Sequence, residues 1–379
     1  MSTDLTRREM FNEIRKLCAP NNYTNWLTLL REYLVFALTV ATAMTAYHWI
    51  VNSGYSLGWM VPIYLATVVV IGVWSQNRLA CLVHESSHYS LFKNRTLNDV
   101  AGNLLVAFPF FGVISNYRIG HWGHHRHVND PEKDPDLMRL EKHHPRQFPI
   151  SKRRFVWEHV ILQFMPHKAF TYILGRAKYV AVVMKHRSVR NQDPLGPNKL
   201  RALRISYYVV LFGTLAYFGC LVHYVLFWIV PFVTVYPATL YLREIAHHGN
   251  YPDNGDYTNS RAYEGYWLER EIFFPFSEQN HVIHHMFPTV PWHKMRDAHS
   301  VLMRYEPYRE NVIVCDGFFF RADAASGNPT VLDLLAAPSP AQLRANGRET
   351  QQSDSIRDKM SVDVGGSGEQ SSEYQHGES

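Results

Sequence analysis

Histidine is the residue type in this sequence whose number and spacing indicate chemistry. The chain has 21 histidines, and many of them fall into four short clusters: residues 84–88 (HESSH), 121–127 (HWGHHRH), 244–248 (EIAHH) and 281–285 (HVIHH). Histidines three or four positions apart share one face of a helix. Because imidazole is the commonest protein ligand for transition metals, this spacing predicts a metal site assembled from several segments.

Candidate ligands come from all four clusters. The nine candidate histidines are His84, His88, His121, His124, His125, His248, His281, His284 and His285. One tetrahedral zinc ion needs about four ligands, so nine imidazoles indicate two metal ions. Iron accepts imidazole and changes oxidation state, whereas zinc has no redox chemistry. Glu244 lies one helical turn before His248, near enough to ligate a metal or to hold a metal-bound water.

The first cluster alone has a competing interpretation. The string from His84 to His88 matches the His-Glu-x-x-His motif of zinc metalloproteases. A membrane zinc hydrolase would use His84, Glu85 and His88 but would leave the other clusters without a role. The motif on its own is therefore weak support for a protease.

Long apolar runs must position these clusters. Residues 33–51 and 57–75 contain no Asp, Glu, Lys or Arg, and a short Asn-Ser-Gly link joins them. The charge-free stretch 205–241 is long enough for two more spans, about 205–221 and 224–241, with a turn near Gly219. A span needs ~20 apolar helical residues, so we predict an all-α integral membrane protein with four transmembrane helices in two hairpins. The shorter, broken stretch 101–115 fits a re-entrant or interfacial segment.

The basic residues predict the orientation in the membrane. Every Lys and Arg lies in residues 1–32, 77–204 or 242–379, and the two hairpin turns have none. The positive-inside tendency then places both termini and all four histidine clusters in the cytoplasm. The net charge of +5 comes without a compact basic stripe, so we expect no nucleic-acid partner. None of the four cysteines forms a C-x-x-C pair.

Composition divides the chain into four parts. We expect a cytosolic or interfacial N-terminal segment (1–32), a membrane domain (33–310) and a C-terminal extension (311–336). Residues 337–379 are rich in Ser, Gly, Gln, Glu and Asp, a composition typical of a disordered tail.

Taken together, the motifs resemble those of the integral-membrane fatty acid desaturases. The similarity lies in HESSH at 84–88, in GHWGHHRH at 120–127 with NDP at 129–131 and DPD at 134–136, in REIAHH at 243–248, and in NHVIHHMFP at 280–288. The resemblance implies four transmembrane helices capped by a helical cytosolic region that holds two non-haem iron ions. It implies the nine histidines as ligands and Glu244 at the place of a residue that often holds a water. His247 adjoins His248, so which of the two binds is open, and His127 fits a supporting role better than ligation.

The resemblance also implies an activity. We expect a dioxygen-dependent oxidoreductase that introduces a double bond into a fatty acyl chain, with membrane lipids around it. A hydroxylase or ketolase acting on an acyl, sphingoid or carotenoid substrate is the alternative on the same scaffold. The chain lacks the His-Pro-Gly-Gly signature of a fused cytochrome b5, so electrons would come from a separate ferredoxin or cytochrome b5-like donor. A non-catalytic metal transporter or sensor would need polar residues along its spans, and these spans have no formal charge.

Overall fold

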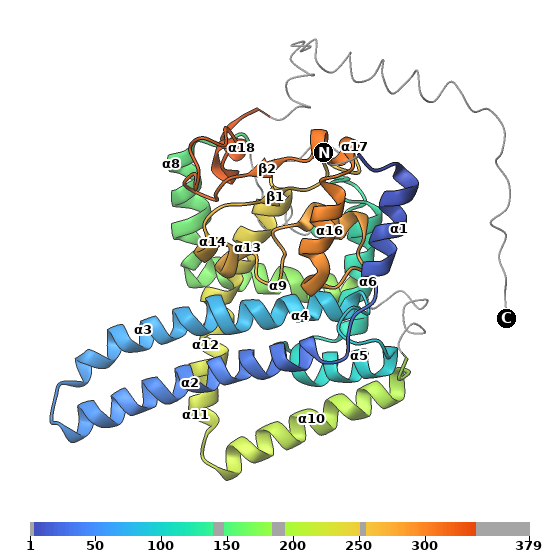
Figure 1. Cartoon of the computed structure of the whole chain (residues 1–379). Coiled ribbons are helices and arrows are strands. Elements are labelled where there is room, and N and C mark those ends of the chain that lie inside the picture. The colour runs from blue at the N-terminus through green and yellow to red at the C-terminus, as the bar shows by residue number, and fades with distance from the viewer. Residues whose placement is uncertain (1–3, 139–147, 184–193, 251–254, 339–379) are drawn as a thin grey trace.

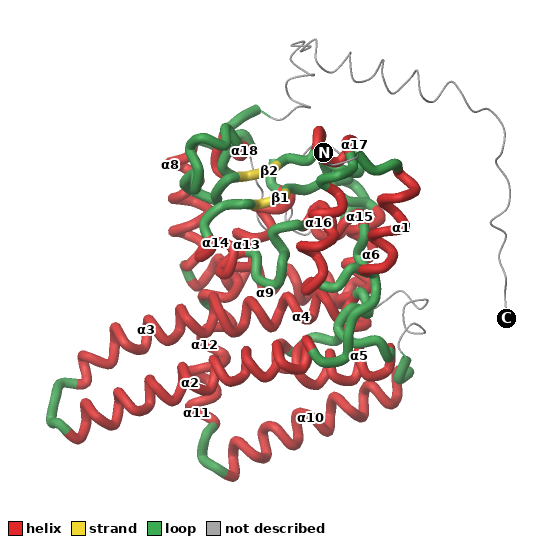
Figure 2. Tube along the Cα trace, in the orientation of Figure 1, coloured by secondary structure: helices red, strands yellow, loops and turns green. Residues whose placement is uncertain are grey.

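The computed structural model describes residues 4–138, 148–183, 194–250 and 255–338. The regular secondary structure of the described chain is helical apart from two strands of two residues each, β1 (Ala262–Tyr263) and β2 (Val314–Cys315). Figure 1 shows a layer of long helices beneath a compact cap of shorter elements, and Figure 2 shows that helices dominate both parts. The predicted tail falls outside the described residues from position 339 onward.

The first predicted hairpin is present. Helix α2 (Thr24–Asn52) is followed by a turn at Gly54. The φ of Gly54, +72°, lies in the left-handed region that glycine adopts readily. The returning helix runs without a break from Leu57 to Ser87. Its parts are η1 (Leu57–Trp59), α3 (Met60–Val70), the π-helical turn η2 (Ile71–Gln76) and α4 (Asn77–Ser87).

Both helices of the hairpin are longer than their charge-free runs. The first extends to Thr24 instead of Tyr33, and the second continues past residue 75. The extra turns contain Glu32 and Arg78, which are both buried and form an ion pair at 3.1 Å. Protein groups satisfy the charges here, so the apolar runs predict only the lipid-facing portion of each helix.

Within the described residues, three helices have the length and composition to cross a membrane: Thr24–Asn52, Leu57–Ser87 and Leu221–His248. The last contains the predicted span 224–241 and is built from α11 (Leu221–Tyr224), η8 (Val225–Ile229), α12 (Val230–Val233) and α13 (Val235–His248). A turn at Gly219, with φ +66°, precedes it as predicted.

The predicted span 205–221 is not one of these three helices. It lies in α10 (Pro197–Tyr217), which carries Arg201 and Arg204 in its first half and therefore has a shorter apolar part. Its Val209 and Val210 are nevertheless each 66% exposed, as lipid-facing residues would be in the absence of lipid. A membrane role for α10, and with it the count of four spans, stays a prediction.

A bent helix pair follows the first histidine cluster and carries most of the second. Helix α5 (Arg95–Gly102) continues through η3 (Asn103–Ala107) and η4 (Phe108–Phe110), and then meets α6 (Ile114–Arg126) at 87°. This is the geometry of a broken span or a re-entrant loop, where the sequence predicts a re-entrant or interfacial segment. The bend turns α6 toward the cap.

Close packing joins the hairpin to α13. A Cβ atom built at Gly72 would lie 2.7 Å from Cβ of Val235, nearer than two side chains approach. Only glycine lets the backbones cross at this distance. The crossing brings the segment that ends at His88 close to the segment that ends at His248.

The cap is built from short helices around buried apolar clusters. Helix α1 (Arg7–Leu17) places Met10 and Ile14 against α16 (Met295–Leu302). The paired strands β1 and β2 join residues near 262 to residues near 314. The other cap elements are α8 (Lys152–Phe155), η5 (Val156–Ile161), η6 (Leu162–Phe164), α9 (Pro166–Val183), α14 (Trp267–Phe273), α15 (His281–Met286), η9 (Trp292–Lys294), α17 (Glu306–Asn311) and α18 (Val331–Ala336).

Candidate metal centre

The fold brings the nine candidate histidines together in two groups. Their imidazoles come from the C-terminal end of α4, from α6, from the end of α13 and from α15. The five-histidine group contains His84, His88, His121, His125 and His284. The four-histidine group contains His124, His248, His281 and His285. Within each group, one nitrogen from every ring lies within 4.8 Å of those of the others.

The four-histidine group has a geometry that hydrogen bonding does not explain. The Nε2 atoms of His248, His281 and His285 form a triangle with sides of 3.1, 3.2 and 3.3 Å. In a neutral imidazole, each ring nitrogen is either a donor or an acceptor. Two of the three Nε2 atoms must therefore have the same role, and at least one contact is repulsive. A cation at the centre of the triangle would satisfy all three lone pairs.

The five-histidine group shows the same convergence. Nε2 of His125 lies 2.9 Å from Nε2 of His284 and 3.1 Å from Nε2 of His121. Both ring nitrogens of the buried His88 lack a hydrogen-bond partner within the described part of the chain. Buried polar atoms without partners are rare, so these orphaned nitrogens also fit bound metal.

The protonation states suit metal binding. Burial lowers the pKa of His88, His284 and His285 well below the ordinary value for histidine. Burial also lowers the pKa of His281, to about 4. Neutral imidazole is the form that ligates metals, so these rings are ready to bind at neutral pH.

Two carboxylates, one from the buried Asp134 and one from the partly buried Glu278, orient ligands from outside the groups. Both oxygens of Asp134 lie 2.9 Å from Nδ1 of His124. Glu278 places one oxygen 2.8 Å from Nδ1 of His84 and the other 3.4 Å from Nδ1 of His281. The hydrogen bond to Asp134 fixes the tautomer of His124 that leaves Nε2 free for a metal. Glu278 places its negative charge beside Nδ1 of His84 and of His281. Burial opposes ionisation of Glu278, but His84, His281 and Arg243 outweigh it and lower its pKa.

A buried ion pair fixes the relative positions of α4, α5 and α6. Arg118 on α6 contacts both oxygens of Asp99, at 2.6 and 3.0 Å. The same guanidinium donates to the backbone carbonyls of Ser86 and Ser87, at 3.2 and 2.8 Å. These carbonyls adjoin the His84–His88 cluster, so one arginine ties two histidine-bearing segments together.

A second arginine performs a similar task at α13. Arg261 donates to the carbonyl oxygens of Ala246, at 2.9 Å, and of Gly249. The last carbonyls of a helix have no partner within the helix, and a cation there is also favoured by the helix dipole. Arg261 therefore stabilises the turn that carries His247 and His248.

The sequence also names His247, Glu244 and His127 as supporting residues, and they differ in how close they lie to the histidine groups. His247 stacks on His281 with ring centres 3.8 Å apart and forms a third metal-compatible group with Glu278 and His281. Glu244 accepts a hydrogen bond from Arg176 at 2.8 Å and lies outside the metal-compatible groups of the described residues. His127 follows the end of α6 and also lies outside those groups.

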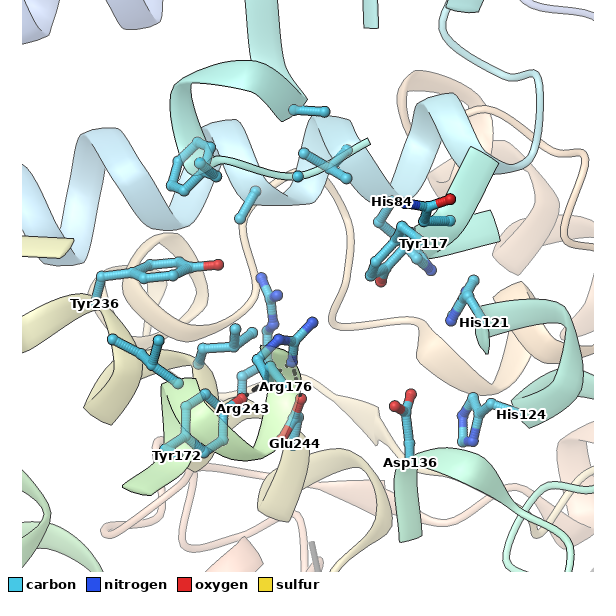
Figure 3. A pocket seen from close by; sticks show the side chains of 18 of the residues that line it. His84, Tyr117, His121, His124, Asp136, Tyr172, Arg176, Tyr236, Arg243 and Glu244 are labelled. Carbon is cyan, nitrogen blue, oxygen red and sulfur yellow. Dashed lines mark hydrogen bonds and ion pairs between the residues drawn. The ribbon is translucent and has the colours of Figure 1, made fainter. Parts of the chain in front are cut away.

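A cavity of about 540 Å³ opens beside the histidines. His84, His121 and His124 lie at one side of the view in Figure 3, and Tyr172 and Tyr236 lie at the other. The apolar part of the wall includes Val83, Phe110, Phe111, Val113, Ile173, Phe232 and Leu240. Arg176, Arg243 and Glu244 lie between the histidines and the tyrosines.

Sequence reasoning missed several residues of this site. Glu278 lies three positions before His281, but α15 begins at His281, so helical spacing does not place Glu278 on its face. Asp99, Arg118 and Arg176 carry no local motif of their own. Their roles follow from contacts between segments far apart in the chain.

Comparison with known proteins agrees with this geometry. The sequence profile of the fatty acid desaturase family matches residues 57–315. The dihydrorhizobitoxine desaturase of Bradyrhizobium elkanii is 27% identical over 344 residues, which cover 86% of this chain and 88% of that protein. A Delta(9) fatty acid conjugase-like enzyme of Dimorphotheca sinuata is 25% identical over 77% of this chain and 82% of its own length. Beta-carotene 4-ketolase 3 of Haematococcus lacustris is 27% identical over 28% of this chain and 34% of its own length.

The profile match spans more than half of the chain and includes all four histidine clusters. The candidate membrane helices and the converging histidines are what such an enzyme needs. The chain belongs to the fatty acid desaturase family and is an integral membrane oxidoreductase.

Proposed function

We propose that the protein is a diiron enzyme that uses dioxygen and electrons to introduce a double bond into a fatty acyl chain. The observation that carries this proposal is the pair of converging histidine groups beside a cavity with an apolar wall. The five-histidine group would hold one iron, and the four-histidine group would hold the other. Bound iron would supply the redox chemistry needed to remove hydrogen from an unactivated C–H bond.

The protein's own residues orient the metal ligands, bind the hydrocarbon part of the substrate and exclude water from it. Asp134 and Glu278 would hold the ligand rings in the orientation that directs Nε2 to the metal. The wall formed by Phe110, Val113 and Phe232 would hold a hydrocarbon segment and exclude water from it. Glu244 lies at the cavity wall and accepts a hydrogen bond from Arg176. It would also hold a water beside the metals.

Iron is the better choice of metal for this donor set. Structural zinc sites are usually closed by four ligands, whereas the nine imidazoles here lie beside an open cavity. A redox reaction also requires a metal that changes oxidation state. A zinc hydrolase centred on His84 and His88 would leave the remaining seven imidazoles unexplained.

The proposed setting follows from the distribution of basic residues. We place both termini and the histidine groups in the cytoplasm, where a separate ferredoxin or cytochrome b5-like protein would deliver electrons. The acyl substrate would enter from the surrounding membrane lipids. A reporter fused after Ser379 should lie on the cytoplasmic side, and an extracytoplasmic reporter would contradict this orientation.

Hydroxylation or ketone formation is the second candidate. It is favoured by the partial similarity to beta-carotene 4-ketolase 3. Mass spectrometry of lipids and free acids from a host expressing the protein distinguishes the reactions, because a new double bond removes two hydrogens and a hydroxyl adds one oxygen. A His125→Ala variant provides the inactive control. Products with added oxygen, or no product in a host with a compatible donor, would contradict desaturation.

A further inference from the structure

We propose that Arg176 and Arg243 bind the carboxylate of the substrate inside the cavity, so that the substrate is a free acid and not an ester or thioester. This inference rests on the proposed function, because it concerns the same cavity. It adds a recognition site for an anionic group to a cavity that is lined by apolar residues and also by the carboxylates Asp136, Glu244 and Glu278.

Arg243 is a buried cation whose contacts are neutral. Its side chain lies in α13, and the residue is 8% exposed. Nη1 lies 3.2 Å from the amide oxygen of Asn77 and 2.5 Å from Sγ of Cys81. Within the described residues, no carboxylate lies at ion-pair distance from it. Glu278 acts on Arg243 only through space, without a direct ion pair, so the guanidinium can still accept an anionic ligand as a direct partner.

Arg176 offers further donors to the same space. It lies on α9, and its Nη1 contacts Glu244 at 2.8 Å and the hydroxyl of Tyr172 at 3.2 Å. Its Nε and Nη2 groups have no hydrogen-bond partner in the part of the chain that the structure describes. Because guanidinium carries five N–H donors, Arg176 can keep its contact with Glu244 and still bind a ligand.

The two guanidinium groups face one space. Both residues line the cavity, and Figure 3 shows both guanidiniums directed toward its centre. A carboxylate presents two oxygens that match the planar fork of an arginine. An ester or thioester has no charge to offer Arg243. The histidines at the same cavity would then act on the chain attached to that carboxylate.

Binding measurements on the purified, iron-loaded, full-length protein test this inference without turnover. The probes are decanoate, methyl decanoate and decyl phosphate, titrated calorimetrically in the same detergent. Decanoate should bind about 10-fold more tightly than methyl decanoate, the difference expected for charged hydrogen bonds. Equal affinity for acid and ester, or tighter binding of the phosphate, would overturn the proposal.

Variants test whether the preference for the acid over the ester depends on Arg176. Arg176→Gln should weaken decanoate binding by about 10-fold and leave methyl decanoate unchanged, and Arg176→Lys should restore part of the loss. Arg154→Gln is the matched control, because Arg154 is exposed and pairs with Glu158 at 2.7 Å. Iron content and thermal unfolding confirm that each variant is folded. An equal loss for acid and ester in a folded Arg176→Gln protein would contradict a carboxylate site.

The two proposals fail in different ways. A preference for the acid that depends on Arg176, without any oxidised product, would leave this inference standing and reject the proposed activity. Desaturation of esters as readily as of acids would support the proposed activity and reject this inference.

Discussion

Oε1 of Glu278 lies 2.8 Å from Nδ1 of His84. The other oxygen of the same carboxylate lies 3.4 Å from Nδ1 of His281. His84 belongs to the five-histidine group and His281 to the four-histidine group. One partly buried carboxylate therefore supports ligands of both proposed irons, from a position outside either group.

Replacing Glu278 should weaken both metal sites at once. Glu278→Gln keeps the side-chain shape but removes the charge that orients two ligand rings, and loss of such a partner typically costs 10–100-fold in metal affinity. Iron retained during dialysis against a graded series of chelator concentrations measures the effect. Glu264→Gln is the control, since the side chain of Glu264 is 58% exposed. Equal iron retention by Glu278→Gln and the unmodified protein would show that Glu278 has no such role.

The sequence predicts the candidate ligands better than their surroundings. Helical spacing places His121, His124 and His125 on one segment, but α6 sends His124 to a different group from the other two. That division depends on how α6 meets α15 and α13, which no local pattern encodes. Glu278 is missed for the same reason, because it lies in the turn before α15 and acts across the fold on His84.

The helix boundaries show a similar limit. Charge-free runs predict where lipid contact is possible, so they stop at polar residues such as Glu32 and Arg78. In the structure those residues are buried against each other and the helices continue through them. The sequence therefore predicts the first hairpin and its turn, while the extent of its helices depends on tertiary ion pairing.

Replacing Asp134 should affect one metal site only. Asp134 contacts His124, a member of the four-histidine group. Asp134→Asn would weaken the hydrogen bonds that orient the His124 ring. We expect iron to fall from about two to about one per chain after mild dialysis, because affinity is reduced at one site. Asp297→Asn, at an exposed position on α16, should keep full iron content. Complete loss of iron from Asp134→Asn would indicate that the two groups do not bind metal independently.

The Asp99–Arg118 pair should be important for stability. Asp99→Asn leaves the buried guanidinium of Arg118 without its carboxylate, and breaking a buried pair in this way costs about 3–5 kcal/mol. Thermal unfolding in detergent should show a large decrease in the unfolding temperature of Asp99→Asn. Glu158→Gln breaks the exposed Arg154–Glu158 pair and should change stability by less than about 1 kcal/mol. Similar effects from the two variants would contradict the structural importance of Arg118.

Helix α18, near the end of the described residues, should be stabilised in a pH-dependent way. Burial opposes ionisation of Asp333, but Lys152 and the backbone N–H and side chain of Thr330 outweigh it and lower its pKa to about 2. A carboxylate with a lowered pKa stabilises the fold above its unfolded pKa of about 3.9, and the effect is lost as the pH falls toward 2.

Asp333→Asn removes this stabilisation at every pH. The unfolding temperature of the unmodified protein should therefore exceed that of Asp333→Asn at pH 5–7, and the gap should close as the pH falls from about 4 to about 2. Differential scanning fluorimetry across this range measures the gap. A gap that is constant or that widens in acid would rule out this ion pair as its source.

The most direct test of the central claim is the metal content of the purified protein after expression in iron-replete medium, measured by mass spectrometry of the metals. Nine converging imidazoles in two groups predict about two irons per chain and little zinc. His248→Ala and His88→Ala should each lower that iron content while leaving the protein in the membrane. Stoichiometric zinc without iron in the unmodified protein would contradict a diiron oxidoreductase.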